Sequence, residues 1–202
     1  MYIIGAGGHG KIVAEIVELL DETIYSFIDE NSSVKQLWEY PVIHEFTNSE
    51  VNAIIAIGDN QVRKRISERY KMNFISLFHP FSQISPRSFI AEGTVIVGGV
   101  IINANAIIGK HVIVNTNSSV GHDVCIEDYV HIAPNVALAG HAYVGEGTFV
   151  GMGASVLPGV KIGKWCTIGA GSVVLENVPD RTTVVGNPAR VINEKTYEHC
   201  NE

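Results

Sequence analysis

The sequence has few basic residues. It contains 14 Lys and Arg against 21 Asp and Glu among 202 residues, so the net charge is −7. Neither half of the chain carries the concentrated positive charge that nucleic acids attract, which argues against a nucleic-acid partner. Charged residues make up only 17% of the chain while 46% is hydrophobic, enough to build a core and to exclude intrinsic disorder.

Cysteine is also scarce, with Cys125, Cys166 and Cys200 lying far apart and without CxxC spacing. This pattern excludes a disulfide framework and a zinc finger, and it favours a reducing compartment. The N-terminal segment lacks the basic and apolar regions of a signal peptide, so we expect a cytoplasmic protein. The uncharged stretch 93–109 contains two asparagines and four glycines, so we expect no membrane span.

An aliphatic residue recurs at every sixth position through the second half of the chain. The series is uninterrupted and consists of Ile84, Ile90, Ile96, Ile102, Ile108, Val114, Val120, Ile126, Ile132, Leu138, Val144, Val150, Val156, Ile162, Ile168 and Val174. A period of six belongs neither to an α-helix nor to a strand meander, but to the hexapeptide repeat of a parallel β-helix. Three hexapeptides make one coil, so the series predicts about five stacked coils.

A second series of small or β-branched residues follows four positions after the first, from Ser88 to Val178. We expect these side chains to point inward as well. Glycines recur near the turns, and we expect them where the backbone needs an unusual conformation; they are Gly109, Gly121, Gly145, Gly151, Gly163 and Gly169. The aliphatic period fails at Asp180, so the chain from Pro179 onward is predicted to cap the stack.

The segment 1–83 has a different pattern and predicts a separate α/β domain. A strand at 2–4 runs into the sequence GAGGHG at 5–10, which matches G-x-G-x-x-G and opens a helix. A second strand at 24–28 ends in Asp29 and Glu30, at the distance where dinucleotide folds place a ribose-binding acid.

Further strands are expected at 51–58 and 73–78, which completes only half of a Rossmann domain. That length favours a single nucleoside diphosphate, with or without a sugar, over NAD. The alternative is that the glycines only allow the helix and strand to pack closely.

Five features in this order identify a known type of protein: the glycine turn, IGDN at 57–60, the hexapeptides, GHD at 121–123 and VGNPAR at 185–190. Over essentially its whole length, the chain resembles the hexapeptide-repeat sugar acyltransferases of the sialic acid O-acetyltransferase type. It is most similar to the bacterial N-acetyltransferases that act on nucleotide-linked 4-amino-6-deoxy sugars, as in the bacillosamine pathway.

The resemblance implies a half-Rossmann domain at 1–83 that binds a nucleotide-linked amino sugar, followed by a left-handed parallel β-helix with a C-terminal cap at 84–202. It further implies acetyl-coenzyme A as cosubstrate, no metal ion, and a homotrimer whose active sites are shared between neighbouring subunits. The aliphatic residues Ile101, Ile107 and Ile113 are expected to face outward, where another subunit could cover them.

Acetyl transfer needs a base, donors for the oxyanion and alignment of both substrates. Among the histidines of the repeat, His122 is the one followed directly by an acid, Asp123. The resemblance makes His122 the catalytic base and Asp123 the residue that tunes it, although relatives often have Glu there. A step of one coil, or three hexapeptides, places Gly140 above His122. Its N–H could hold the thioester oxygen there, and the resemblance points to the same position.

The resemblance also assigns binding residues. For acetyl-coenzyme A they are His131, Gly140, Met152 and Ala170; for the nucleotide sugar they are Gly7, Gly8, His9, Asp29, Glu30 and Gly58.

Some questions stay open at this point. Asp123 lies one coil below His141, so it could pair with either histidine. The nucleotide could be UDP, dTDP, GDP or CMP, and the group that accepts the acetyl could be an amine or a hydroxyl. The rival functions are sialic acid O-acetylation, non-catalytic binding of a nucleotide sugar, and a zinc hydratase, although the spacings of His111, His122, His131 and His141 disfavour the last.

Overall fold

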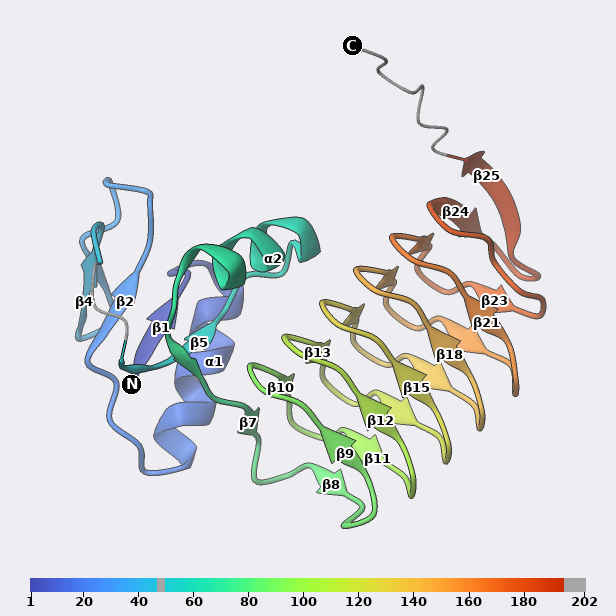
Figure 1. Cartoon of the computed structure of the whole chain (residues 1–202), viewed down its shortest axis with the longest axis horizontal. Helices are drawn as coiled ribbons and strands as arrows, with labels where there is room; N and C mark the ends of the chain where they lie inside the picture. Colours follow the sequence, from blue (N-terminus) through green and yellow to red (C-terminus); the bar gives the residue numbers. More distant parts are fainter. Residues whose placement is uncertain (47–49, 195–202) are drawn as a thin grey trace.

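The computed structural model describes residues 1–46 and 50–194 and shows a small α/β domain at one end of a long solenoid (Figure 1). The domain contains a six-stranded sheet in the order β3-β4-β2-β1-β5-β6. Its strands are β1 (Tyr2–Ile4), β2 (Ser26–Ile28), β3 (Gln36–Leu37), β4 (Tyr40–Ile43), β5 (Asn52–Ile55) and β6 (Asn73–Phe74), and its helices are α1 (Gly8–Leu19) and α2 (Asn60–Arg69). No helix among the described residues is both long and apolar enough to cross a membrane.

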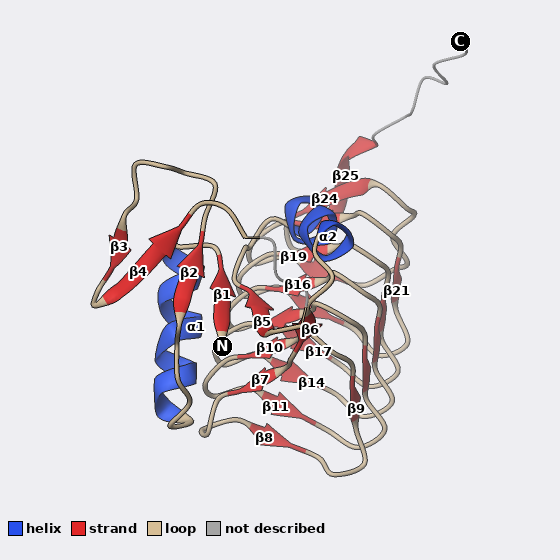
Figure 2. Cartoon of the chain, turned by 60° about the vertical axis from the view of Figure 1, so that its left-hand side comes forward, coloured by secondary structure: helices blue, strands red, loops and turns tan. Residues whose placement is uncertain are grey.

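The two helices cover opposite faces of this sheet (Figure 2). Because side chains alternate along a strand, Ile3 packs with the apolar stripe of α1 while its neighbour Ile4 packs with Ile66 and Tyr70 around α2. The strands β4, β2, β1, β5 and β6 run parallel, as a strand–helix–strand pattern predicts.

Two details of this domain differ from the sequence-based expectation. The hairpin of β3 and β4 was not predicted, because its strands are short and lack a clear apolar alternation. The strand expected at 73–78 is two strands: β6 pairs with β5, whereas β7 (Leu77–Phe78) pairs with β10, a strand of the solenoid. The solenoid thus starts at Leu77, before the period of six becomes visible.

The solenoid is built from very short strands that form three parallel sheets, one on each face of a prism. The first face contains β7, β10 (Val95–Ile96), β13 (Ile113–Val114), β16 (His131–Ile132), β19 (Phe149–Val150) and β22 (Thr167–Ile168). The second face contains β8 (Gln83–Ile84), β11 (Ile101–Ile102), β14 (Ser119–Val120), β17 (Ala137–Leu138), β20 (Ser155–Val156) and β23 (Val173–Val174). The third face contains β9 (Phe89–Ile90), β12 (Ile107–Ile108), β15 (Cys125–Ile126), β18 (Tyr143–Val144) and β21 (Lys161–Ile162).

Each strand pairs with its equivalent three hexapeptides later, as in Val95 with Ile113, so one coil has the predicted length. The aliphatic series fills the interior: every member from Ile96 to Val174 is at most 2% exposed. The second series is buried too from Thr94 onward, and the hydroxyls of Thr94, Ser118 and Thr148 donate to backbone carbonyls, as Thr148 does to Gly163 at 2.7 Å. Such complete burial of polar groups is stable because each one has a hydrogen-bond partner.

The glycines near the turns play a different part from the one expected. Gly109, Gly121, Gly145, Gly151, Gly163 and Gly169 do not have a positive φ. A Cβ on Gly145 would lie 2.7 Å from the backbone of Gly163 in the next coil, so these positions need glycine for close approach.

The unusual backbone occurs two positions later instead. There, fourteen successive positions from residue 93 to residue 171, six apart, have φ between 53° and 75°; they are Gly93, Gly99, Asn105, His111, Asn117, Asp123, Tyr129, Asn135, His141, Gly147, Gly153, Gly159, Trp165 and Gly171. We call these positions the left-handed turn slots. Asn, Asp, His and Gly dominate them because these residues tolerate the left-handed region best.

The solenoid ends where the period fails. β22 pairs with β24 (Thr182–Val185), and Thr167 lies opposite Thr183, a shorter step along the chain than the full coil from Phe149 to Thr167. β24 then pairs antiparallel with β25 (Arg190–Glu194), which covers the last coil's open edge.

The N-terminal domain lies against the first coils of the solenoid, at the left end of Figure 1, and its core includes Leu77 and Val95 of the first face. Val95 and Ile113, whose side chains face outward from the prism, are fully buried beneath it. Ile113 thus faces outward as expected, but the docked domain of the same chain, rather than another subunit, covers it. Ile101 and Ile107, on the second and third faces, are 43% and 52% exposed, as expected.

Candidate active site

The turn between β14 and β15 carries His122 and Asp123 on one edge of the prism. Asp123 occupies a left-handed turn slot, and the equivalent slot of the next coil holds His141. The backbone joins the two coils here, because the His141 N–H donates to the His122 carbonyl at 3.0 Å. The sequence-based expectation that Asp123 lies below His141 is thus confirmed.

Asp123 contacts both histidines, and His122 is the nearer. Its Oδ2 lies 2.7 Å from Nδ1 of His122 and 3.9 Å from Nε2 of His141. Its Oδ1 accepts a hydrogen bond from Asn105, in the turn slot one coil below, at 3.1 Å. The hydrogen bond with His122 is the main cause that lowers the pKa of Asp123, with Asn105 second.

This arrangement fixes the tautomer of His122. An ionised carboxylate only accepts, so Nδ1 of His122 carries the proton and Nε2 keeps a free lone pair. The His122 side chain is 61% exposed, so a substrate could reach that lone pair from solvent. The chemistry available is proton abstraction by an oriented imidazole.

Gly140 lies against the free nitrogen, as the sequence predicts. A Cβ on Gly140 would be 2.6 Å from both Cε1 and Nε2 of His122. The imidazole of His122 therefore fills the space that a side chain at position 140 would need, and only glycine there lets the ring lie against the next coil.

The glycine turn lies in the N-terminal domain. Gly7 precedes α1 and offers no side-chain cap, so the first N–H groups of the helix have no side-chain partner at this end. Such an uncapped helix start attracts anions. Gly7 and Gly8 are exposed, and a Cβ on either would meet open space.

The two acids after β2 behave differently from each other. Asp29 accepts from the Ala6 N–H at 2.8 Å and so braces the glycine turn from the side. Glu30 is exposed and pairs with Arg69 at 2.6 Å. Both lie near the glycine turn, and only Asp29 contacts it directly.

His131 lies beside two residues of the N-terminal domain that are predicted to bind the nucleotide sugar. Its Nδ1 is 3.2 Å from the Gly58 carbonyl, and its ring centroid is 6.4 Å from that of His9. Burial is the main cause that lowers the pKa of both imidazoles to about 4, so both are neutral at pH 7. Nε2 of His9 is buried and has no hydrogen-bond partner among the described residues.

Arg63, on α2, connects these parts, and sequence reasoning missed its role. Its side chain is fully buried and donates to the carbonyls of Ile57 (2.8 Å), His111 (2.7 Å) and Tyr129 (2.7 Å). It thereby fixes the loop that carries Gly58 against two successive coils. An arginine in a helix is ordinary in a sequence, and nothing in the pattern signals that its partners are carbonyls of a distant repeat.

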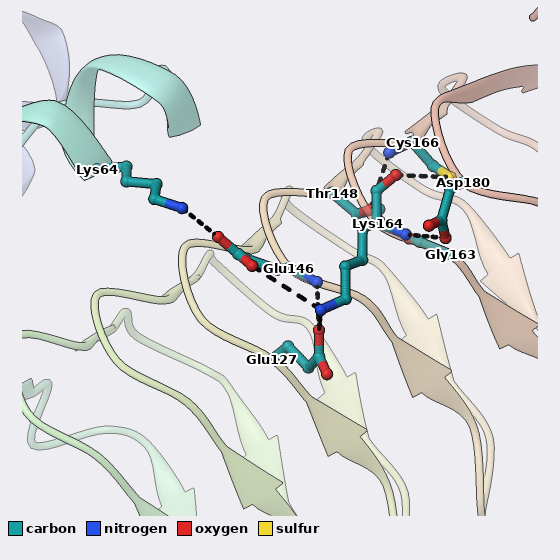
Figure 3. A network of polar contacts seen from close by, with 8 residues as sticks. All are labelled: Lys64, Glu127, Glu146, Thr148, Gly163, Lys164, Cys166 and Asp180. Atoms are coloured by element: carbon teal, nitrogen blue, oxygen red, sulfur yellow. Dashed lines mark hydrogen bonds and ion pairs between the residues drawn. The ribbon is translucent and has the colours of Figure 1, made fainter.

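Charged side chains add a second link between α2 and the solenoid (Figure 3). Lys64 pairs with Glu146 at 2.6 Å, and Lys164 lies 3.4 Å from Glu127. A groove of about 770 Å³ lies between α2 and the later coils of the solenoid. Its lining includes Gly58, Lys64, Arg65, Phe149, Trp165 and Arg181.

The remaining predicted residues lie on another edge of the prism. Met152, 56% exposed, follows β19, and Ala170 follows β22 one coil above it. They line the edge between the first and second faces, whereas His122 lies on the edge between the second and third. Within one chain, His122, the edge of Met152 and Ala170, and the glycine turn therefore do not come together.

The four histidines of the hydratase hypothesis do not form one cluster. His111 is buried beneath Phe74 of the N-terminal domain and stacked on Tyr129, and His131 faces Gly58. Among the described residues, the group of three potential metal ligands is His122, Asp123 and His141.

Comparison with known proteins identifies the family. Residues 1–70 match the PglD N-terminal domain, and residues 141–176 match the bacterial transferase hexapeptide (six repeats). A histidine-to-asparagine variant of perosamine N-acetyltransferase from Caulobacter crescentus, in complex with CoA and GDP-perosamine, is 33% identical over 95% of this chain and 96% of that one, with a TM-score of 0.90. The chain belongs to the hexapeptide-repeat sugar N-acetyltransferases.

Two further members of this family show the same relationship. The acetyltransferase domain of PglB from Neisseria gonorrhoeae FA1090, in complex with acetyl coenzyme A, is 32% identical over 95% of this chain and 98% of that one, with a TM-score of 0.88. UDP-N-acetylbacillosamine N-acetyltransferase from Bacillus subtilis is 41% identical in an alignment of 107 residues that covers 47% of this chain and 50% of that one. The matched region spans half or less of the curated relatives' own length.

Proposed function

We propose that this protein transfers the acetyl group of acetyl-coenzyme A to the 4-amino group of a nucleotide-diphosphate-linked amino-deoxy sugar, for surface glycan biosynthesis. The observation that carries the proposal is the His122–Asp123 pair at 2.7 Å, which leaves the lone pair on Nε2 of His122 free next to Gly140 of the following coil. The structural relatives that bind CoA together with GDP-perosamine support this acceptor class.

The reaction follows from the geometry of the base. The amine nitrogen attacks the thioester carbon while Nε2 of His122 takes a proton from that nitrogen. The carbonyl oxygen becomes an oxyanion, which we place against the Gly140 N–H. The C–S bond then breaks, the coenzyme A sulfur leaves as a thiolate, and the imidazolium returns its proton to the sulfur. Asp123 stabilises the imidazolium between these two steps.

We place the diphosphate of the acceptor at the uncapped start of α1, near Gly7 and Gly8. We assign His9, Asp29, Glu30 and Gly58 to the same acceptor site in the N-terminal domain. His131 contacts Gly58, and we place it near the thioester, where the acceptor and acetyl-coenzyme A meet. We place coenzyme A along the edge of Met152 and Ala170.

The shared site is the reason to propose a homotrimer. Within one chain the base and the edge of Met152 lie on different corners of the prism, so a neighbouring subunit has to bring them together. We also place the protein in the cytoplasm. The free thiols Cys125 and Cys166 suit a reducing compartment, while Cys200 lies outside the described residues.

The direct test is acetyl transfer from acetyl-coenzyme A to a panel of acceptors, followed by detection of the released thiol. The panel contains UDP-, dTDP- and GDP-linked 4-amino sugars, CMP-sialic acid and free sialic acid. We expect turnover with at least one amino sugar and none with the sialic acids. Turnover with sialic acid alone would make the protein an O-acetyltransferase, and nucleotide-sugar binding without acetyl-coenzyme A binding would make it a non-catalytic binder.

A further inference from the structure

The cluster of His122, Asp123 and His141 has more ligand atoms than a catalytic base needs. Two imidazoles flank one carboxylate oxygen, at 2.7 Å for Nδ1 of His122 and 3.9 Å for Nε2 of His141. One ligand atom from each residue lies within 4.8 Å of the others. A base requires the first contact only, and His141 has no part in the proposed reaction.

The positions of these side chains are set by the repeat rather than by flexible loops. Asp123 and His141 occupy equivalent turn slots in successive coils, with φ of 59° and 61°. Backbone hydrogen bonds hold each turn to the coil below, from Asp123 to Ala104 and from His141 to His122, both at 3.0 Å. The side chains themselves are 61%, 37% and 65% exposed for His122, Asp123 and His141, so small χ rotations can draw the three atoms to within about 2 Å of a common ion.

We propose that these three residues form an inhibitory site for a divalent transition-metal ion, with zinc as the best match. Two imidazole nitrogens and one carboxylate oxygen form a zinc ligand set, and exposure leaves a fourth position for water. Magnesium and calcium prefer oxygen ligands throughout, so they bind this site poorly. The inhibitory part of the proposal rests on the proposed function, because it requires His122 to be the base.

Inhibition follows from the proton on the imidazole. In the metal-free site Nδ1 of His122 carries a proton toward Asp123, and Nε2 has the lone pair that accepts the substrate proton. A metal ion at Nδ1 needs the lone pair of that nitrogen, so the Nδ1 proton leaves and neutral His122 must carry its proton on Nε2. Nε2 then cannot accept a proton, and the ion also withdraws Asp123 from the imidazole.

The test begins with binding, which does not depend on any substrate. Zinc chloride is titrated into tag-free full-length protein by calorimetry, without acetyl-coenzyme A or acceptor. His141→Asn is the decisive variant, since Asn occupies the equivalent turn slot at residues 105, 117 and 135 and should preserve the backbone. His79→Asn is the matched control, because it removes a histidine of the first coil that lies outside the cluster.

We expect one zinc ion per chain in the wild type and in His79→Asn. In His141→Asn we expect affinity at least about tenfold weaker, since even the loss of an outer-shell contact costs that much. No zinc binding by the wild type, or equal binding by His141→Asn, would overturn the site.

The second measurement is the acetyl-transfer rate, each protein being compared with its own rate in EDTA. Zinc should inhibit the wild type and His79→Asn reversibly and inhibit His141→Asn only at higher concentration, while magnesium should not inhibit. Zinc bound at the cluster with the rate unchanged would overturn the inhibitory mechanism. A protein that binds zinc but acetylates no acceptor even in EDTA would instead count against the proposed function, and the binding result would stand by itself.

Discussion

The residue next to the proposed base fulfils two requirements at once. Asp123 has a φ of 59°, a region that Asp and Asn occupy more readily than most residues. In this conformation its short side chain reaches Nδ1 of His122 at 2.7 Å, so the lack of a longer Glu does not weaken the contact. The backbone of the turn slot therefore explains why an aspartate suffices here.

Replacing His122 by alanine should remove the base. We expect kcat to fall by about 10² to 10⁴, with little change in coenzyme A affinity. Asp123→Asn should lower kcat less, because it keeps the turn-slot conformation and the imidazole but loses the carboxylate charge. Steady-state kinetics at pH 7 and pH 9 measure both effects.

The pH dependence of the His122→Ala variant separates a base from a merely structural histidine. With an amine acceptor, a higher pH should partly restore the rate, because the amine then arrives already deprotonated. Wild-type turnover of His122→Ala at neutral pH would contradict the assignment, and His131 and His141 would be tested next.

Some site residues could be predicted from the sequence and others could not. The stacking of Gly140 on His122 and of His141 on Asp123 follows from a step of one coil along the repeat, and the structure confirms both. The neighbours of His131 could not be predicted, because they depend on how the N-terminal domain docks. No period in the sequence encodes that contact.

At the level of the turns, glycine serves two separate purposes. A Cβ on Gly145 would lie 2.7 Å from the backbone of Gly163, so glycine at this position allows the coils to approach each other. Gly153 has a φ of 70° and open space around it, so it serves the backbone conformation alone. The sequence shows both as glycine in a repeat and does not distinguish them.

This distinction predicts opposite outcomes for two substitutions. Gly145→Ala should lower the free energy of unfolding by about 1–3 kcal/mol or more, since backbone atoms cannot move aside as a side chain can. Gly153→Asn should change it by less than about 0.5 kcal/mol, because Asn tolerates this φ and the site is exposed. Urea unfolding of both variants measures the difference, and equal destabilisation would contradict the two-role interpretation.

The contact between the domain and the solenoid contains three neutral histidines. Burial is the main cause that lowers the pKa of His9, His111 and His131 to about 4, and the Arg63 charge lowers all three further. In the unfolded chain these imidazoles titrate near pH 6.5. The unfolded state therefore binds more protons between pH 6.5 and pH 4, so stability is full above this window and falls as the pH drops through it.

Removing one of these histidines should flatten the pH dependence of stability. The variant His111→Asn keeps a residue that tolerates the φ of 53° and removes one titrating group. We expect the slope of the unfolding free energy between pH 6 and pH 5 to decrease by about 1.4 kcal/mol per pH unit. Urea unfolding at these pH values measures the slope, and an unchanged slope would show that His111 does not titrate with folding.

For the whole molecule, the sequence predicts the architecture far better than the assembly of its parts. The solenoid could be predicted because each coil repeats the same local pattern, and the burial of Ile96 through Val174 confirms it. The docking of the N-terminal domain depends on the bond from Arg63 to His111 and on the Lys64–Glu146 pair, whose partners lie far apart in the sequence. Such single long-range contacts leave no periodic signal, and the burial of Ile113 is their consequence.

The second and third faces of the prism differ in charge, and this difference favours one of them as the contact of the proposed homotrimer. The outward residues of the second face from the second coil upward are Ile101, Ser119, Ala137, Ser155 and Val173, all uncharged and none larger than isoleucine. From the second coil upward the third face carries Ile107, Cys125, Tyr143 and Lys161, of which Lys161 is charged. Subunit interfaces lack charge at their centre, so we assign the second face to the trimer contact.

The substitution Ala137→Arg tests this assignment and the shared site together. A charge at the centre of the second face should be buried without a partner in the trimer, so we expect light scattering to show monomers. Acetyl transfer should fall with trimer content, because an isolated chain holds His122 and Met152 on different edges. Lys161→Glu, on the third face, is the control and should retain both the trimer and the rate. A wild-type protein that is monomeric at micromolar concentration and fully active would contradict the shared site, since one chain alone would then complete the reaction.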